Sequence, residues 1–203
     1  MNKTATMMIN SREVGMQKAL EATEKLAEDS GLSKKEILHL RLLAEELLGM
    51  LRSIAGDVEA DYWLEYQDKS FALYMKSEIK LTEQMRRQLL SASSSGENEA
   101  ARGFMGKLRV MIAEKLFFNM PGSSLLSLGV MSMASPSAQA AAGGAYVWSM
   151  EKYMNSVKNE KDENAAASEA WDELEKSIVA NIADEVSVRI VGHNVEIAVS
   201  KAF

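Results

Sequence analysis

Two adjacent glutamates have the spacing best suited to acid–base chemistry in this sequence. Glu46 shares a helix face with Leu43 and Met50, which puts its carboxylate at the margin of an apolar stripe. A carboxylate that loses water there becomes a stronger base, as a general base near neutral pH requires. Its neighbour Glu45 shares a face with Arg41, which predicts a solvated ion pair instead. Glu46 is therefore our candidate catalytic residue, the alternative being a boundary carboxylate with its head in water.

A glycine-rich turn supplies the second candidate, a site for an anionic group. Gly103 and Gly106 open a predicted helix over residues 100–118, and Lys107 follows them. Free backbone amides at a helix start attract anions, glycines let a ligand approach the backbone, and the lysine adds a positive charge. The pattern suits an anionic group, but two glycines at this spacing are more often explained by close helix packing.

The amino-acid composition excludes several kinds of functional site. The 203 residues include no cysteine, which excludes disulfides, thiolate zinc sites, iron–sulfur clusters and a cysteine nucleophile. The two histidines, His39 and His193, are too few for a multi-histidine metal site, and both are expected at the surface. The net charge of −6 repels nucleic acid, and no basic run exceeds two residues. The sequence has no P-loop, nucleophile elbow or dinucleotide fingerprint.

The elements that must position these residues begin with a strand at 4–9 and a helix from about 11 to 29. Ser33 and Glu36 then form a capping box for a second helix. The apolar stripe of that helix, over residues 37–54, requires a sheet or another helix to cover it.

The remainder of the chain alternates between hairpins and helices. Segments of period two predict one hairpin closed by Asp68-Lys69 and another closed by Gly192-His193-Asn194. The expected elements are strands at 57–67 and 70–79, helices at 82–91, 100–118, 146–157 and 165–183, and strands at 186–191 and 195–199. This order predicts an α+β fold, a two-layer sandwich with a mixed sheet of about five strands covered by helices. The first and last strands are expected in one sheet.

One long segment is uncharged. Residues 116–150 carry no Asp, Glu, Lys or Arg, although 26% of the chain is charged. Its best apolar run is about half the ~20 residues that a membrane-spanning helix needs, so no transmembrane segment is expected. The two ends, 116–118 and 146–148, are expected to pack on the domain. Residues 123–144 are expected to be mobile or to contact a partner or the periphery of a membrane.

The order of the first elements resembles a known family. A strand, a Ser-initiated helix, the turn Gly31-Leu32-Ser33 and a helix reading LRLLAEELLGML over 40–51 resemble the start of GHKL-type ATP-binding domains, which have the histidine kinase-like ATPase fold. The similarity is greatest to the anti-sigma factor serine kinase branch. It covers residues 1–117 and 185–203 and leaves 118–184 as an insertion, helical in its second half, without a counterpart in the family.

The resemblance assigns roles to individual residues. Glu46 falls on the glutamate that orients or deprotonates the attacking group, and Met50 falls on the asparagine that holds magnesium. Ser77 or Glu78 falls near the aspartate that reads the adenine amino group, although the glycines of that motif are missing.

The third family motif is a glycine-rich turn entering a helix. The segment around Gly103, Gly106 and Lys107 resembles it, so the resemblance implies nucleotide binding by these three residues and by Ser77. Residues 80–102 would then correspond to the lid over the nucleotide.

These departures predict a degenerate ATP-binding protein, regulatory in role, in which ATP is the implied ligand and catalysis is weak or absent. Magnesium binding stays open, because a soft thioether at Met50 replaces a hard oxygen ligand. The alternative is a non-catalytic protein-interaction module of the anti-sigma-factor type, favoured by the missing motif residues and the uncharged segment. Both interpretations imply a cytoplasmic, bacterial protein with a protein partner and without nucleic acid, and self-association stays open.

Overall fold

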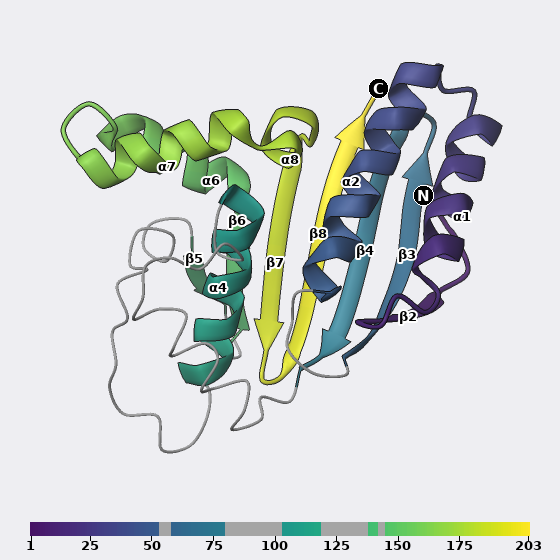
Figure 1. Cartoon of the computed structure of the whole chain (residues 1–203), viewed down its shortest axis with the longest axis horizontal. Helices are drawn as coiled ribbons and strands as arrows, with labels where there is room; N and C mark the ends of the chain where they lie inside the picture. The colour runs from purple at the N-terminus through teal and green to yellow at the C-terminus, as the bar shows by residue number, and fades with distance from the viewer. Residues whose placement is uncertain (53–57, 80–102, 119–137, 142–144) are drawn as a thin grey trace.

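The structure is a computed structural model, and it describes residues 1–52, 58–79, 103–118, 138–141 and 145–203 (Figure 1). The predicted helix at 82–91 lies outside these residues, as does the segment 80–102 that the resemblance treats as a lid. Among the described residues, no helix is both long and apolar enough to cross a lipid bilayer.

The described elements alternate between strands and helices. The first part of the chain contains β1 (Asn2–Lys3), β2 (Met7–Asn10), α1 (Met16–Asp29), α2 (Lys34–Arg52), β3 (Glu59–Gln67) and β4 (Ser70–Glu78). The second part contains α4 (Gly103–Phe118), β5 (Ala138–Ala141), β6 (Ala145–Ser149), α6 (Met150–Glu160), α7 (Ala165–Lys176), α8 (Ile178–Ile182), β7 (Glu185–Val191) and β8 (Asn194–Ala202).

All described strands belong to one sheet, in the order β1-β3-β4-β8-β7-β6-β5. β2 also pairs with β3, so β1 and β2 share one edge, and every pairing of these described strands is antiparallel. The predicted α+β sandwich is confirmed, and the first and last strands do share a sheet. The sheet is larger than the predicted five strands, because β5 and β6 extend it from within the uncharged segment. It is also antiparallel and not mixed, since every described pairing is antiparallel.

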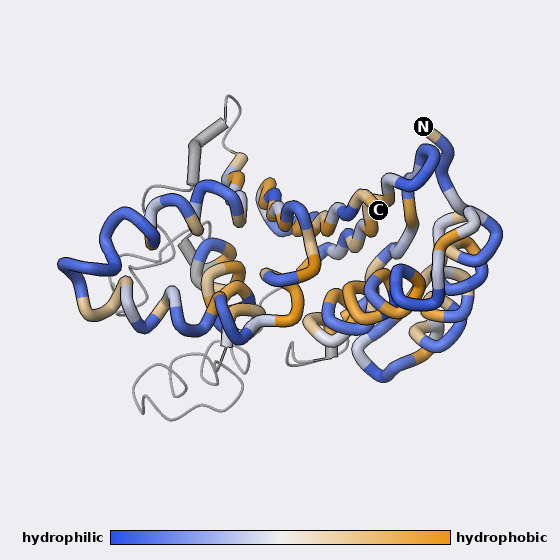
Figure 2. The backbone as a smooth tube through the Cα atoms, turned by 90° about the horizontal axis from the view of Figure 1, so that it is seen from above, coloured by the Kyte–Doolittle hydropathy of each residue, from blue (hydrophilic) through white to orange (hydrophobic). Residues whose placement is uncertain are grey.

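Strand alternation gives the sheet one apolar face, which the helices cover. Direct neighbours across five strands form a buried row on that face: Tyr62, Met75, Ile197, Val188 and Trp148. α1 contacts β3, α2 contacts β4 and β8, and α4 contacts β7. Seen from above, α1 and α2 lie together on one side of the sheet (Figure 2). The core therefore lies between one sheet face and a layer of helices.

The start of α2 follows the predicted capping box. The backbone amide of Ser33 donates to Glu36 Oε2 at 2.6 Å, and the amide of Glu36 donates to Ser33 Oγ at 3.4 Å. These hydrogen bonds to Ser33 lower the pKa of Glu36. The reciprocal pair satisfies two amides that have no partner within the helix.

The helix predicted over 146–157 begins later, at Met150. Tyr146-Val147-Trp148 are strand-favouring residues that pair with β7, which is why they form β6. The first turn of α6 is then capped twice, because Ser149 Oγ accepts from the Lys152 amide and the Glu185 carboxylate accepts from the amides of Met150 and Glu151.

The uncharged segment packs at both ends as predicted. Leu116 and Trp148 are fully buried. Between them, residues 138–141 form β5 and pair with β6, whereas this part was expected to be mobile or partner-bound. The remaining residues of the segment, 119–137 and 142–144, lie outside the described ones.

The predicted helix start near residue 11 is displaced to Met16 by a tight turn. Asn10 Oδ1 accepts from the amides of Arg12 and Val14 at 3.0 Å each, which holds residues 10–14 in a loop. Gly15 follows with φ +81°, and a Cβ on this glycine would lie 2.4 Å from the Met8 carbonyl oxygen.

Replacing Gly15 by Ala is therefore expected to destabilise the fold by more than the ~1–2 kcal/mol of left-handed backbone strain, since it adds a backbone clash. Gly31→Ala is the matched control, because Gly31 has φ +71° and a Cβ at that position would have no neighbouring atom within 4 Å. Urea denaturation of both variants measures the difference. Equal losses of unfolding free energy would contradict the role of the Met8 contact.

A buried hydrogen-bond chain fixes α1 on the sheet. Thr23 Oγ1 donates to the Ala19 carbonyl at 2.8 Å, and the Tyr62 hydroxyl lies 2.8 Å from the same threonine oxygen. Since the threonine has one proton, Tyr62 must donate to Thr23. Both side chains are fully buried, and burial raises the pKa of Tyr62 far above its ordinary value of 10.0.

Stability is accordingly expected to fall as the pH rises above about 10. The folded state keeps Tyr62 neutral while the unfolded chain ionises, which lowers the free energy of unfolding by roughly 1.4 kcal/mol per pH unit. Burial also raises the pKa of Tyr153, to about 12, so it adds to the same slope. Urea denaturation between pH 8 and 11.5 should show a shallower slope for Tyr62→Phe than for the unsubstituted chain. Identical slopes would contradict the assignment.

Candidate functional site

The candidate catalytic residue lies on a helix that is mostly core. Glu46 is half-buried on α2, while the apolar residues around it are buried: Leu43, Leu47, Leu48, Met50 and Leu51. Met50, on the position that the resemblance gives to a magnesium ligand, is 4% exposed. The structure thus places Glu46 at the margin of the apolar stripe, as the sequence predicted.

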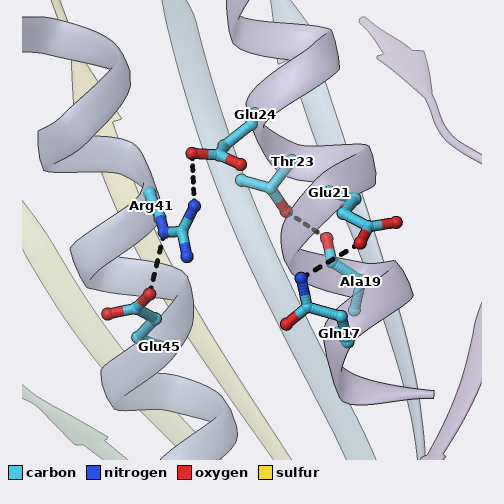
Figure 3. Close-up of polar contacts among 7 residues, drawn as sticks. All are labelled: Gln17, Ala19, Glu21, Thr23, Glu24, Arg41 and Glu45. Carbon is cyan, nitrogen blue, oxygen red and sulfur yellow. Dashed lines mark hydrogen bonds and ion pairs between the residues drawn. The ribbon is translucent and has the colours of Figure 1, made fainter.

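Glu45 forms the predicted ion pair, and the pair extends to a neighbouring helix. Arg41 Nε lies 2.8 Å from Glu45 Oε1, and Arg41 Nη1 lies 2.6 Å from Glu24 Oε1 on α1 (Figure 3). Hydrogen bonds to both carboxylates, Glu24 first, raise the pKa of the guanidinium. Within α1, Gln17 Nε2 donates to Glu21 Oε1 at 3.0 Å (Figure 3). Arg41 therefore joins α1 to α2, and Glu45 is structural.

The predicted adenine-reading residue is turned into the sheet–helix interior. Ser77 is buried near the end of β4, and its hydroxyl donates to the Glu59 carbonyl at 2.6 Å. Only the lone pairs of its oxygen remain for a ligand. Its neighbour Glu78 points to the opposite face of the sheet, because successive strand residues alternate.

The glycine-rich turn is also built into packing. Gly103 is the first residue of α4 and has φ +74°, and Gly106 is buried one turn later. Phe104, between them, packs against Trp148 and Tyr153 with ring centroids 6.0 and 6.5 Å away. Gly103 itself is not closely packed, because a Cβ there would have no neighbouring atom within 4 Å, so the packing at this turn comes from Phe104.

Lys107 is already paired with a carboxylate. Its Nζ lies 2.7 Å from Glu173 Oε2 on α7, and the two side chains are 25% and 23% exposed. Glu173 also contributes, after burial, to the raised pKa of Tyr153. The lysine that was expected to attract an anionic group thus neutralises an acid of its own chain.

The five predicted site residues are not gathered at one place. α2, which carries Glu46, contacts both β4 and α4. Ser77 and the Gly103–Lys107 turn are separated across the sheet. Ser77 lies on β4, whereas Phe104 of the turn packs on Trp148 of β6, and β8 and β7 lie between these two strands.

The second face of the sheet carries a feature that the sequence reasoning missed. We call it the open face, defined by residues that are direct neighbours across the strands: the row Met8, Asp61, Lys76, Glu196, Arg189 and Val147, and the row Trp63, Tyr74, Ala198, Ser187 and Ser149. Among the described elements, the helix contacts are made with the opposite face, whose alternate residues are buried.

Aromatic rings stand on this open face. Trp63 and Tyr74 stack with centroids 5.0 Å apart and planes 3° from parallel, and Lys3 Nζ lies 4.2 Å from the Trp63 ring centroid on the edge strand. Trp63 Nε1 donates to Glu65 Oε1 at 3.2 Å. The two-residue turn at Asp68-Lys69 sets this pairing, so the hairpin register alone could have revealed it.

The comparisons with known proteins assign no family. No protein-family model matches this chain, and no curated protein matches it in sequence. The chemistry must therefore be judged from the residues themselves.

The residues at the family positions do not fit a magnesium–nucleotide complex. Mg²⁺ prefers oxygen ligands, and Met50 offers a buried thioether. Within the part of the chain that the structure describes, no group of three or more His, Asp or Glu side chains could hold a metal ion. Lys107 faces Glu173 instead of an open anion site.

Removing Lys107 should cost stability, because Glu173 would keep its partly buried carboxylate without the opposing charge. We expect Lys107→Met to lower the free energy of unfolding by about 1–2 kcal/mol, and Glu173→Leu in the same chain to restore most of it. Lys201→Met is the control, since its partner Asp184 is 49% exposed and such pairs contribute less than about 1 kcal/mol. Equal losses for the two lysines, measured by urea denaturation, would contradict a structural role of Lys107.

Proposed function

We propose that this chain acts by binding another protein, as a non-catalytic interaction module of the anti-sigma-factor type, and does not turn over ATP. The proposal includes the cytoplasmic, bacterial setting that the resemblance implies. The observation that carries it is the burial of Met50 in the core, at the position where the GHKL resemblance requires a magnesium ligand.

Two further observations support this proposal. The hydroxyl of Ser77 donates to the Glu59 carbonyl, and Lys107 is paired with Glu173, so both residues have partners within the chain. The sheet also keeps an open face on which half-buried Tyr74 stacks on buried Trp63, and the exposed part of Tyr74 is suited to contact with a protein. A degenerate ATP-binding regulator is the competing proposal, and nucleotide titration separates the two.

Isothermal titration calorimetry with ATP, with and without Mg²⁺, is expected to show no magnesium-dependent binding. Phosphate release should stay far below the ~1 s⁻¹ typical of an active kinase, because no oxygen ligand stands at position 50. A magnesium-dependent heat of binding, or turnover at about 1 s⁻¹ or above, would overturn the proposal.

Replacing Met50 by asparagine, the residue of GHKL domains at this position, tests the absence of turnover and also the packing of Met50 in the core. Met50→Asn should not create turnover and should destabilise the fold by about 2–4 kcal/mol, because it buries an amide in an apolar core. Met8→Asn is the matched control, since Met8 is 69% exposed and the same change there should be nearly neutral. A stable Met50→Asn variant with ATPase activity would favour the competing proposal.

A further inference from the structure

The open face offers one aromatic surface that its own neighbours leave uncovered. One side of the Trp63 ring is covered by Lys3 and the other by Tyr74. Beyond Tyr74 the same row continues through Ala198 and Ser187, whose small side chains rise little above the sheet. The far side of the Tyr74 ring therefore forms a wall above a floor of small residues.

The charges around this wall are mainly negative. The described residues of the open face include six acids, Glu59, Asp61, Glu65, Glu78, Glu185 and Glu196, and three bases, Lys3, Lys76 and Arg189. Partial burial, followed by the charges of Glu65 and Glu196, raises the pKa of the Tyr74 phenol. A group that lies against the far side of Tyr74 is thus near Glu196 on β8, while Glu65 lies on the Trp63 side of the ring.

A guanidinium or another aromatic ring could stack on Tyr74, and the negative charge of the face favours the guanidinium. A guanidinium stacks on aromatic rings, is attracted to their faces and forms directional hydrogen bonds with carboxylates. Both the stacking wall and the neighbouring Glu196 suit such a group. The hydroxyls of Ser187 and Ser200, on the floor, add hydrogen-bond acceptors for its remaining N–H groups.

We infer that the open face binds a basic, arginine-bearing segment of a partner protein, with one guanidinium stacked on Tyr74 above Ala198 and Ser187. The inference rests on the proposed function as a protein-binding module and names the surface and the chemistry of the partner. Exposed Met8, at the end of the row through Asp61 and Lys76, adds an apolar contact beside the charged ones.

The same charges disfavour the other occupants of a sheet face. Two copies of this chain that met face to face would bring two acidic surfaces together, and the whole chain carries a net charge of −6. Nucleic acid and anionic lipid would meet the same repulsion. Lys76 and Arg189, interleaved with the acids, also favour a partner of mixed charge over a pure polycation.

The test uses peptides as probes of the partner's chemistry. The ¹⁵N-labelled full chain is titrated with a capped peptide of alternating glycine and arginine, and with matched peptides that carry lysine or glutamate. We expect the arginine peptide to shift the Trp63 indole signal and the amides of Tyr74, Ala198 and Ser187, more strongly than the lysine peptide and less at high salt. Saturation of these shifts gives the affinity of each peptide.

Variants then separate stacking from charge. Tyr74→Ser should weaken the arginine peptide about tenfold, and Tyr74→Phe, which keeps the ring, should retain its binding. The amide spectrum of Tyr74→Ser away from the open face should stay unchanged, which shows that this variant is folded. Glu196→Gln should weaken it, whereas Glu163→Gln, on the exposed turn before α7, should not.

Three results would overturn the inference: equal binding of the lysine and arginine peptides, shifts confined to other surfaces, or no shift at millimolar peptide. Self-association of the chain that Tyr74→Ser abolishes would also overturn it, by showing that a second copy covers the face. These failures leave the proposed function intact so long as ATP is neither bound with magnesium nor hydrolysed, so the two are judged separately.

Discussion

The antiparallel pairing of β4 with β8 is the interaction on which the rest of the structure depends. It joins nine residues of each strand, from Ser70 opposite Ala202 to Glu78 opposite Asn194. On one side of this seam lie β1 to β3, and on the other lie β5 to β7. α2 contacts both strands of the seam, so its apolar stripe connects two halves that are far apart in sequence. A shift of this register by one residue would turn Leu73 and Met75 out of the core.

Much of the fold follows from local patterns, because each is decided by neighbouring residues. The capping box of α2, both hairpins and the Arg41–Glu45 pair depend on residues at most four positions apart or on strict alternation. The larger failures arise where distant contacts decide, whereas the displaced start of α1 comes from the local turn at Asn10. Tyr146-Val147-Trp148 form a strand because β7 is available to pair with them, and no local signal announces that partner. The size of the sheet was underestimated for the same reason.

The candidate site was harder to predict than the fold. Sequence spacing placed Glu46 correctly at a core boundary, since helical periodicity is a local property. It could not show that Lys107 faces Glu173 across two helices, or that β8 and β7 separate Ser77 on β4 from β6, on which the Gly103 turn packs. Side chains whose spacing suggests a ligand site can thus be taken up by packing and ion pairs instead. What the fold then presents is the surface that no described helix covers.

The divided edge strand has a consequence for how the protein behaves at high concentration. β1 and β2 pair with β3 over two and four residues, and between them Thr4 Oγ1 accepts a hydrogen bond from the Leu64 amide. A threonine hydroxyl occupies the place of a backbone carbonyl there, so the outer border of the sheet has no long, regular run of free amides and carbonyls. Such a border is a poor template for another strand. At this edge, therefore, the sheet can carry aromatic rings on its neighbouring strands without offering a regular border for strand addition.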